Sequence, residues 1–134
     1  MDKKRLKKEY RETPRQMGVF LIRNIANDKV FLGAGLDLVG TMNRHKFQLT
    51  NGSHQNTRLQ KDWNEVGSSN FAFEIIDQIT PQDDPAFDSK AELEFMEKLW
   101  LQELQPFGER GYNQRKLSRG EMLARIAASR SDEL

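Results

Sequence analysis

The sequence predicts a small α+β domain in which a three-stranded antiparallel sheet is flanked by helices. Two short runs of strand-forming residues, 19–22 and 30–32, are separated by a turn-forming stretch at 26–29. Two runs this close pair antiparallel, because a parallel return needs a crossover of a dozen or more residues. A third stretch alternates as a strand does, and the stretches around it have helical periodicity. This order of elements favours helices packed on an antiparallel sheet.

The overall composition is that of an ordinary soluble protein and fits one main domain. The chain has 134 residues, 31% charged and 37% hydrophobic, with a net charge of +1. A nucleic-acid surface would therefore require an uneven distribution of charge. The absence of cysteine excludes disulfides, thiolate metal sites and cysteine nucleophiles, and suits a cytoplasmic protein. No signal peptide and no apolar run near 18 residues is found, so we expect no membrane association.

The first sixteen residues form a basic arm. Residues 2–16 hold seven Lys or Arg and three Asp or Glu, and Thr13-Pro14 ends any helix before the first strand. Two interpretations stay open: an arm that contacts phosphates, or a solvated helix that keeps the protein soluble. The candidate phosphate contacts are Lys3, Lys4, Arg5, Lys7 and Lys8. We expect three parts, namely this arm (1–16), the main domain (17–115) and a C-terminal helix with a tail (116–134).

The two helices expected after the hairpin lead to the third strand. Asp37 occupies a helix-cap position, and the apolar stripe that follows ends before Asn51-Gly52. The stripe consists of Leu38, Met42, His45 and Leu49. His45 on this stripe is either a satisfied boundary residue or a functional one. A second helix is expected over 56–66 and the third strand over 71–76, where large apolar residues alternate.

The C-terminal half of the main domain contains a candidate metal-binding carboxylate. An acidic connector at 81–88 precedes a helix predicted over 89–104. Glu97 lies at the edge of the buried stripe of that helix, where a carboxylate needs a cation, donors or water. Pro106 stops the helix, and a short extended piece follows at 111–113. A capping-box pattern beginning at Ser118 predicts a last helix over about 122–128.

Several short motifs resemble those of the GIY-YIG nuclease superfamily. Gly18-Val19-Phe20, ten residues and then Phe31-Leu32-Gly33 are similar to its signature, with phenylalanine in place of both tyrosines. Further similar elements occur in the same order as in the phage homing-endonuclease type, and the match covers about 17–115. They are the run from Asn51 to Trp63, the strand at 70–75, Glu97-Lys98-Leu99-Trp100 and Gly111-Tyr112-Asn113. The resemblance implies a three-stranded sheet with flanking helices and metal-dependent cleavage of phosphodiesters.

The resemblance also implies roles for particular residues. Glu97 would hold Mg²⁺ or Mn²⁺, a role for which one carboxylate and several waters suffice. His45 and Asn113 would support the reaction, and Gly33 would let the backbone approach the site. The remaining family positions are altered: the two tyrosines correspond to Phe20 and Phe31, and the arginine of the first helix corresponds to Thr41. Phenylalanine has no oxygen with which to relay a proton.

Three functions remain open from the sequence. The first is a catalytically weakened or inactive nuclease-fold protein that binds nucleic acid, expected to be DNA, through the basic arm and cations of the helices. Those cations are Arg44, Lys46, Arg58 and Lys61. Some chains of the superfamily with a degenerate first helix are labelled as LuxR-type regulators, a label that would imply a regulatory role. A LuxR-type module needs a helix-turn-helix domain, however, and the roughly twenty residues after Asn113 have room for one helix only. The second is a slow divalent-metal-dependent endonuclease in which Arg44 and His45 substitute for lost groups. The third is a protein-interaction module without nucleic acid, suggested by the acidic connector.

Overall fold

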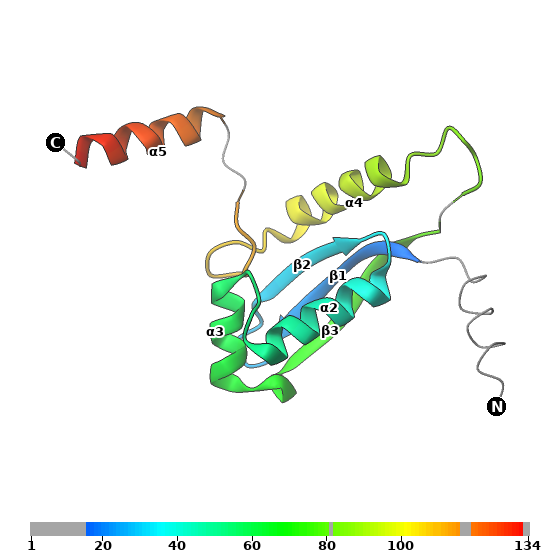
Figure 1. Ribbon diagram of the computed structural model, residues 1–134, viewed down its shortest axis with the longest axis horizontal. Coiled ribbons are helices and arrows are strands. Elements are labelled where there is room, and N and C mark those ends of the chain that lie inside the picture. The colour runs from blue at the N-terminus through cyan, green and yellow to red at the C-terminus, as the bar shows by residue number, and fades with distance from the viewer. Residues whose placement is uncertain (1–15, 81, 116–118, 133–134) are drawn as a thin grey trace.

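The computed structural model describes residues 16–80, 82–115 and 119–132, so the basic arm at 1–15 and Ser118 lie outside the described residues. A three-stranded antiparallel sheet with helices around it forms the main body, and the predicted α+β class is confirmed (Figure 1). The elements in chain order are β1 (Met17–Asn24), β2 (Val30–Gly35), α2 (Leu38–Asn51), α3 (Thr57–Val66), a 3₁₀ turn (Ser68–Asn70), β3 (Phe71–Ile79), α4 (Ser89–Leu104) and α5 (Arg119–Asp132).

The strands are arranged in the order β2-β1-β3, with β1 in the centre. β1 pairs antiparallel with both neighbours, so the sheet is a hairpin extended by β3. Phe20 and Phe31 therefore lie on adjacent antiparallel strands, as predicted; Phe20 pairs with Gly33 and Phe31 with Ile22. The turn between the two strands is closed by Asp28, whose φ of 62° is in the left-handed region.

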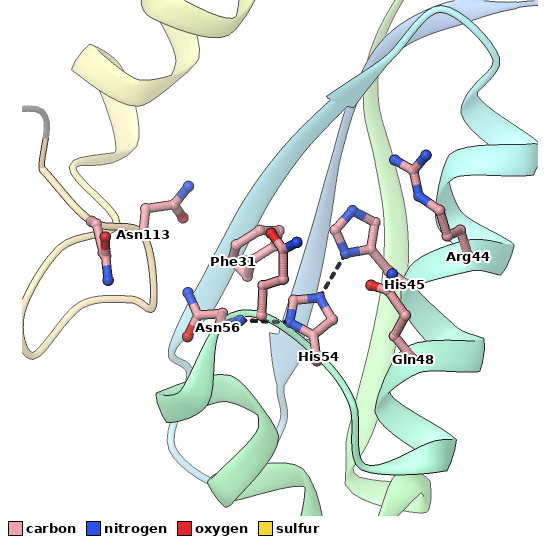
Figure 2. Close-up of a pocket in the computed structure, with 9 residues that line it drawn as sticks. Phe31, Arg44, His45, Gln48, His54, Asn56 and Asn113 are labelled. Atoms are coloured by element: carbon pink, nitrogen blue, oxygen red, sulfur yellow. Dashed lines mark hydrogen bonds between the residues drawn. The ribbon is translucent and has the colours of Figure 1, made fainter.

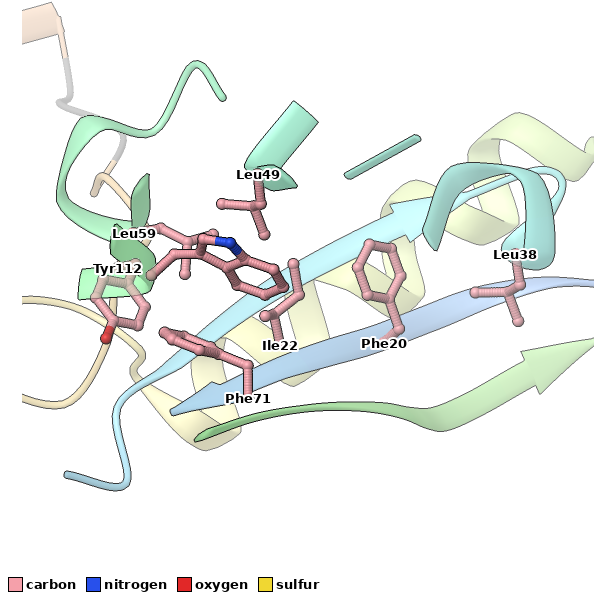
Figure 3. Packing of buried hydrophobic residues seen from close by; sticks show 8 residues of the cluster. Phe20, Ile22, Leu38, Leu49, Leu59, Phe71 and Tyr112 are labelled. Atoms are coloured by element: carbon pink, nitrogen blue, oxygen red, sulfur yellow. The ribbon is translucent and has the colours of Figure 1, made fainter. Parts of the chain in front are cut away.

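Alternation along the strands gives the sheet two different faces. Phe20 and Ile22 point to the face covered by α2 and α3, where they pack with other buried side chains (Figure 3). These partners are Leu38, Leu49, Leu59, Trp63, Phe71 and Tyr112. Leu21 and Leu32 point to the opposite face and pack with residues of α4. Each such large apolar side chain contributes about 1.5–3 kcal/mol when fully buried, so α2 and α4 are held on opposite faces by separate cores.

The predicted core is only partly correct. Trp63, Phe71 and Leu93 are buried, as predicted. The other three residues expected in the core are half-buried, namely Phe73, Met96 and Trp100. Trp100 donates its indole N–H to Asp77 Oδ2 at 2.9 Å, which keeps the polar edge of the ring near the surface. Phe73 lies on β3, which is an edge strand and is covered from fewer sides than β1.

A buried tyrosine attaches the segment after α4 to the sheet. Tyr112 donates its hydroxyl proton to Asp62 Oδ2 at 2.6 Å and accepts from Asn24 Nδ2 at 3.0 Å. Burial, together with the hydrogen bond to Asp62, raises the pKa of Tyr112 to about 12, so the hydroxyl stays a donor. The backbone of this segment also bonds to the outer edge of β2, where Val30 forms a parallel bridge with Gly111. These contacts place the following residue, Asn113, beside β2.

The last helix leaves the main body, and its predicted position is correct in outline. α5 spans Arg119–Asp132, which is longer than the 122–128 expected, and it extends away from the sheet (Figure 1). Its apolar residues Met122, Leu123 and Ile126 are exposed. Across the described ranges, none of the helices combines the length and the hydropathy needed to cross a membrane.

Candidate functional site

A pocket of about 570 Å³ opens between α2, the loop that precedes α3, and the outer part of β2. Figure 2 shows the two histidine rings next to each other, with Arg44 projecting from α2 and Asn113 across the pocket. Phe31 forms the wall contributed by the sheet. The lining residues are Phe31, Arg44, His45, Gln48, His54, Gln55, Asn56, Asn113 and Gln114. The lining thus combines one guanidinium, two imidazoles and five side-chain amides, and it contains no carboxylate.

The ends of α2 and α3 bring the two histidines together. Asp37 caps α2 by accepting from Gly40 N, as predicted, and α2 ends at Gly52, whose φ of 75° reverses the chain. His54 follows two residues after that reversal, and its ring meets the ring of His45. Asn56 then caps α3 by accepting from Leu59 N. The His45–His54 contact is therefore produced by a helix end and a helix start that lie next to each other in sequence.

His45 and His54 form a direct pair. Their rings approach at Nδ1 of His45 and Nε2 of His54, which are 2.7 Å apart. His54 is buried, and its Nδ1 accepts the backbone N–H of Asn56 at 3.0 Å. Burial, His54 and Arg44 together lower the pKa of His45 to about 4, and burial also lowers the pKa of His54. Both rings are therefore neutral at pH 7. His45 is not a lone histidine on an apolar stripe, as the sequence suggested, but half of a pair.

The two phenylalanines of the family signature both lie against His45. The ring centroids of Phe20 and Phe31 are 5.4 and 5.5 Å from that of His45. Their surroundings differ, because Phe20 is completely buried whereas Phe31 is half-buried and lines the pocket. Of the two positions that correspond to the family tyrosines, only Phe31 reaches the pocket, because the ring of Phe20 is enclosed by the core beneath α2.

Gly33 and Thr41 are close to the site without lining the pocket. A Cβ added to Gly33 would lie 2.4 Å from Cζ of Phe20, so glycine is needed for the ring to pack there. The side chain of Thr41 rests on Gly35 in the same way, since a Cβ there would lie 2.2 Å from Thr41 Oγ1. The cation that does line the pocket is Arg44, one turn further along α2.

Asn113 lines the pocket, but its amide is engaged with the backbone. Its Oδ1 accepts from Leu32 N at 2.8 Å and its Nδ2 donates to Leu32 O at 2.9 Å. Asn113 therefore binds β2 as a neighbouring strand residue would. Because oxygen and nitrogen are both used in this way, the geometry indicates that Asn113 fixes the position of the loop beside the pocket.

Glu97, the carboxylate that the resemblance assigns to the metal, does not line the histidine pocket. It belongs to α4, on the opposite face of the sheet from α2. It lines a separate pocket of about 310 Å³ together with Ala34, Gly35, Leu36, Lys90, Leu93 and Glu94. Within the described ranges, no group of three or more His, Asp or Glu side chains is placed to hold a metal ion. The histidine pocket has no carboxylate in its lining, so a metal site of the implied kind, with one carboxylate and waters, would lie at Glu97 and not between the histidines.

The predicted nucleic-acid contacts divide into two sets. The candidate contacts of the arm lie outside the described residues. The four helix cations are exposed and lie on α2 and α3, which cover the same face of the sheet. Arg44 lines the histidine pocket, and Lys61 lines an adjoining pocket that shares His54. Arg58 donates to Gly108 O at 2.6 Å and so also attaches the loop after α4.

The sequence reasoning missed several lining residues, above all His54. His54 stood within the Asn51–Trp63 run but was given no role there. The usable signal was that the chain contains two histidines, nine residues apart, on either side of a helix stop at Gly52. The amides of Gln48, Gln55, Asn56 and Gln114 had no comparable signal, since exposed amides are common in loops.

Comparison with known proteins identifies the fold. The structure is similar to that of the catalytic domain of homing endonuclease I-TevI, with a TM-score of 0.61 and 27% identity over 75% of this chain and 99% of that one. A glutamate-to-alanine variant of the I-TevI catalytic domain has a TM-score of 0.62 and 26% identity, over 77% of this chain and 97% of that one. The chain is a GIY-YIG-like protein.

The curated protein that matches by sequence is also an endonuclease, as are the two structural neighbours. Intron-associated endonuclease 1 of Enterobacteria phage T4 is 29% identical over 87 residues, or 65% of this chain. The match spans 32% of that longer relative, so this chain corresponds to about a third of its length. No protein-family profile matches the sequence. The GIY-YIG-like chain thus has the nuclease fold.

Proposed function

We propose that this GIY-YIG-like protein binds DNA through the face formed by α2 and α3, and that its capacity for hydrolysis is weakened or lost. The observation that carries the proposal is the composition of the histidine pocket. It offers hydrogen-bond donors and one cation, but Phe31 replaces a hydroxyl-bearing residue and no carboxylate lines it. Such a pocket suits a phosphate oxygen, which accepts hydrogen bonds, better than it suits the activation of water.

The binding part of the proposal depends on where the cations lie. Arg44 reaches the pocket, and its planar guanidinium can bind two oxygens of one phosphate. Lys46 and Lys61 are exposed on the same two helices and add charge beside it. The neutral amides of the pocket would position a phosphate group, and contacts to phosphate do not depend on the base sequence of the DNA. A regulatory role through occupancy of DNA would follow from binding without cleavage.

The weakened hydrolysis depends on the missing groups. General-base assistance is worth about 10²–10⁴ in rate, and Phe20 and Phe31 have no oxygen with which to provide it. One well-placed electrostatic donor is worth about 10²–10³, and Thr41 is not a cation. These losses need not be additive, but a partial sum already leaves a very slow enzyme.

A matched pair of lysine variants tests the binding face. Lys46→Gln and Lys98→Gln each remove one positive charge from an exposed helix position, on α2 and on α4 respectively. Lys46→Gln should weaken binding to a short duplex and reduce the salt slope by about 1, whereas Lys98→Gln should have little effect. Arg44→Gln should weaken binding further. Equal effects of the two lysine variants, or no binding at low salt, would contradict the proposed face.

A cleavage assay tests the second part. The wild-type protein should leave supercoiled plasmid intact over a long incubation with Mg²⁺ or Mn²⁺. The triple change Phe20→Tyr, Phe31→Tyr and Thr41→Arg should increase nicking if the fold is retained, and adding Glu97→Ala should abolish that gain. Metal-dependent cleavage by the wild type would refute the weakened state.

A slow metal-dependent endonuclease is the second candidate, and one observation favours it. Arg44 lines the pocket beside His45, where it could replace the guanidinium missing at Thr41. In that case Arg44→Gln would lower both binding and the slow cleavage, and Glu97→Gln would lower cleavage alone. A metal role for Glu97 then needs its carboxylate to approach from the α4 side. A measurement of Mn²⁺ binding by the wild type and by Glu97→Gln separates the two candidates.

A further inference from the structure

The hydrogen bonds of His54 determine which of its ring nitrogens carries the proton. Its Nδ1 accepts the backbone N–H of Asn56 at 3.0 Å, and an accepting nitrogen has no hydrogen. In the neutral ring the proton is therefore on Nε2. The ring is held in this orientation because it is buried and both of its nitrogens have hydrogen-bond partners.

The same argument extends to His45. Nε2–H of His54 points at Nδ1 of His45 across 2.7 Å, so His45 Nδ1 must be the acceptor. The proton of the neutral His45 is then on its own Nε2. Figure 2 shows this second ring nitrogen on the side of the ring away from His54. The described residues contribute no partner to it, and they leave no buried side-chain nitrogen or oxygen unpaired, so Nε2 is open to the pocket.

From this chain of bonds we propose that His54 is a positioning residue that fixes His45 as a hydrogen-bond donor to the pocket. The Asn56 N–H sets the tautomer of His54, which sets that of His45. A fixed Nε2–H can donate to an oxygen of a ligand, but it leaves His45 with no free lone pair for a water proton or a transition metal. The expectation that His45 could act as a base is therefore replaced by a donor role.

The ligand that this donor fits is an oxyanion, and here the inference rests on the proposed function. Arg44 and the Nε2–H of His45 both line the pocket, so one phosphate oxygen can take a charged and a neutral donor. The tautomer itself does not depend on that function, because it belongs to the free protein. The two statements can therefore fail separately.

The test uses the full chain without a tag, with ¹⁵N-labelled histidine, because the sequence has only two histidines. Two-bond correlations from the carbon-bound ring protons show which nitrogen of each ring lacks a proton at pH 7.5. We expect Nδ1 to be unprotonated and Nε2 to be protonated in both rings. A protonated Nδ1 in either ring would overturn the assignment, and this reading needs no variant.

Three variants test the positioning role. In His54→Leu, the Nδ1–H population of His45 should increase about 2- to 10-fold, the range that follows from the net strength of one hydrogen bond. His54→Gln retains a donor near the position of Nε2 and should keep His45 in the wild-type tautomer. Gln48→Leu changes another residue that lines the pocket and should alter neither ring. A His45 tautomer unchanged by His54→Leu would show that His54 does not set it.

Titration with a short DNA duplex at low salt then tests the donor role. The His45 Nε2 resonance should shift on binding while Nδ1 stays unprotonated. Protonation of Nδ1 on binding would mean that His45 acts as a cation, and an unshifted Nε2 with bound duplex would remove it from the interface; either result overturns the donor role. Absence of binding would instead contradict the proposed function and leave the tautomers of the free protein as assigned.

Discussion

Phe20→Tyr and Phe31→Tyr should have very different effects on stability, because the two side chains lie in different environments. Phe20 has none of its surface exposed, and its Cζ lies against Gly33, where an added Cβ would come within 2.4 Å. A tyrosine hydroxyl at Cζ would be placed into this contact without an assured partner. Phe31 is half-buried and borders the pocket, so its hydroxyl would be hydrated.

The expected magnitudes follow from these surroundings. A buried hydroxyl without a partner costs about 1–3 kcal/mol, so Phe20→Tyr should lower the free energy of unfolding by that amount. At about 4 °C per kcal/mol for a domain of this size, its Tm should fall by about 4–12 °C. Phe31→Tyr should change the free energy of unfolding by less than about 0.5 kcal/mol, as exposed substitutions do. Thermal unfolding followed by circular dichroism, at one protein concentration, measures both.

The comparison can fail in an informative way. If Phe20→Tyr left the Tm within about 2 °C of the wild type, the space around the Phe20 ring would contain a partner or a water for the hydroxyl. Our description of this ring as fully enclosed by the core would then be refuted. Activity would then be recoverable at this position without a loss of stability. A destabilised Phe20→Tyr would mean that the triple variant has to be checked for folding before its cleavage is interpreted.

Three further predictions concern stability. Gly33→Ala should cost about 1–3 kcal/mol in urea unfolding, because its Cβ would overlap the buried Phe20 ring, and a neutral result would show that the ring can move. Tyr112→Phe removes the hydroxyl that donates to Asp62 and should cost about 1–3 kcal/mol, whereas an unchanged urea midpoint would mean that water replaces these bonds. The pKa of His45 is lowered from 6.5 to about 4 in the folded protein, so between these pH values the unfolded chain binds more protons than the folded one. The free energy of unfolding is therefore retained above pH 6.5 and decreases as the pH falls towards 4. We expect a loss of about 1–2 kcal/mol after allowance for solvent screening, and a smaller loss in His45→Gln, in which only His54 still contributes; equal pH profiles would exclude His45 as the cause.

Local patterns in the sequence predicted the elements well, because each depends on nearby residues. The hairpin, the cap at Asp37 and the helix over 89–104 follow from turn, capping and periodicity rules, and the structure has them. β3 runs three residues beyond its predicted end, to Ile79, since its outer part continues to pair with β1. Boundaries of this kind depend on pairing with a distant strand, which the local sequence does not contain.

The candidate site was harder to predict, because it depends on which face of the sheet each helix covers. Glu97 and His45 have suitable spacing within their own helices, but α4 and α2 cover opposite faces. The His45–His54 pair depends on how sharply the chain turns at Gly52, which spacing alone does not give. Asn113 is a similar case. The sequence indicated that this residue belongs to the site, but its hydrogen bonds to Leu32 depend on the tertiary structure, which the local sequence does not contain.

The bonds made by Asn113 also bear on self-association. β2 is an outer strand, and such a strand offers unpaired N–H and C=O groups to which another chain can add. Here Val30 is occupied by the backbone around Gly111, and Leu32 is occupied by the side chain of Asn113. The side chain of Asn113 thus takes the place of a strand neighbour and protects the part of this edge from Val30 to Leu32 from intermolecular β-pairing. Asn113→Ala would expose the groups of Leu32 and would convert a protected margin of the sheet into a template for aggregation.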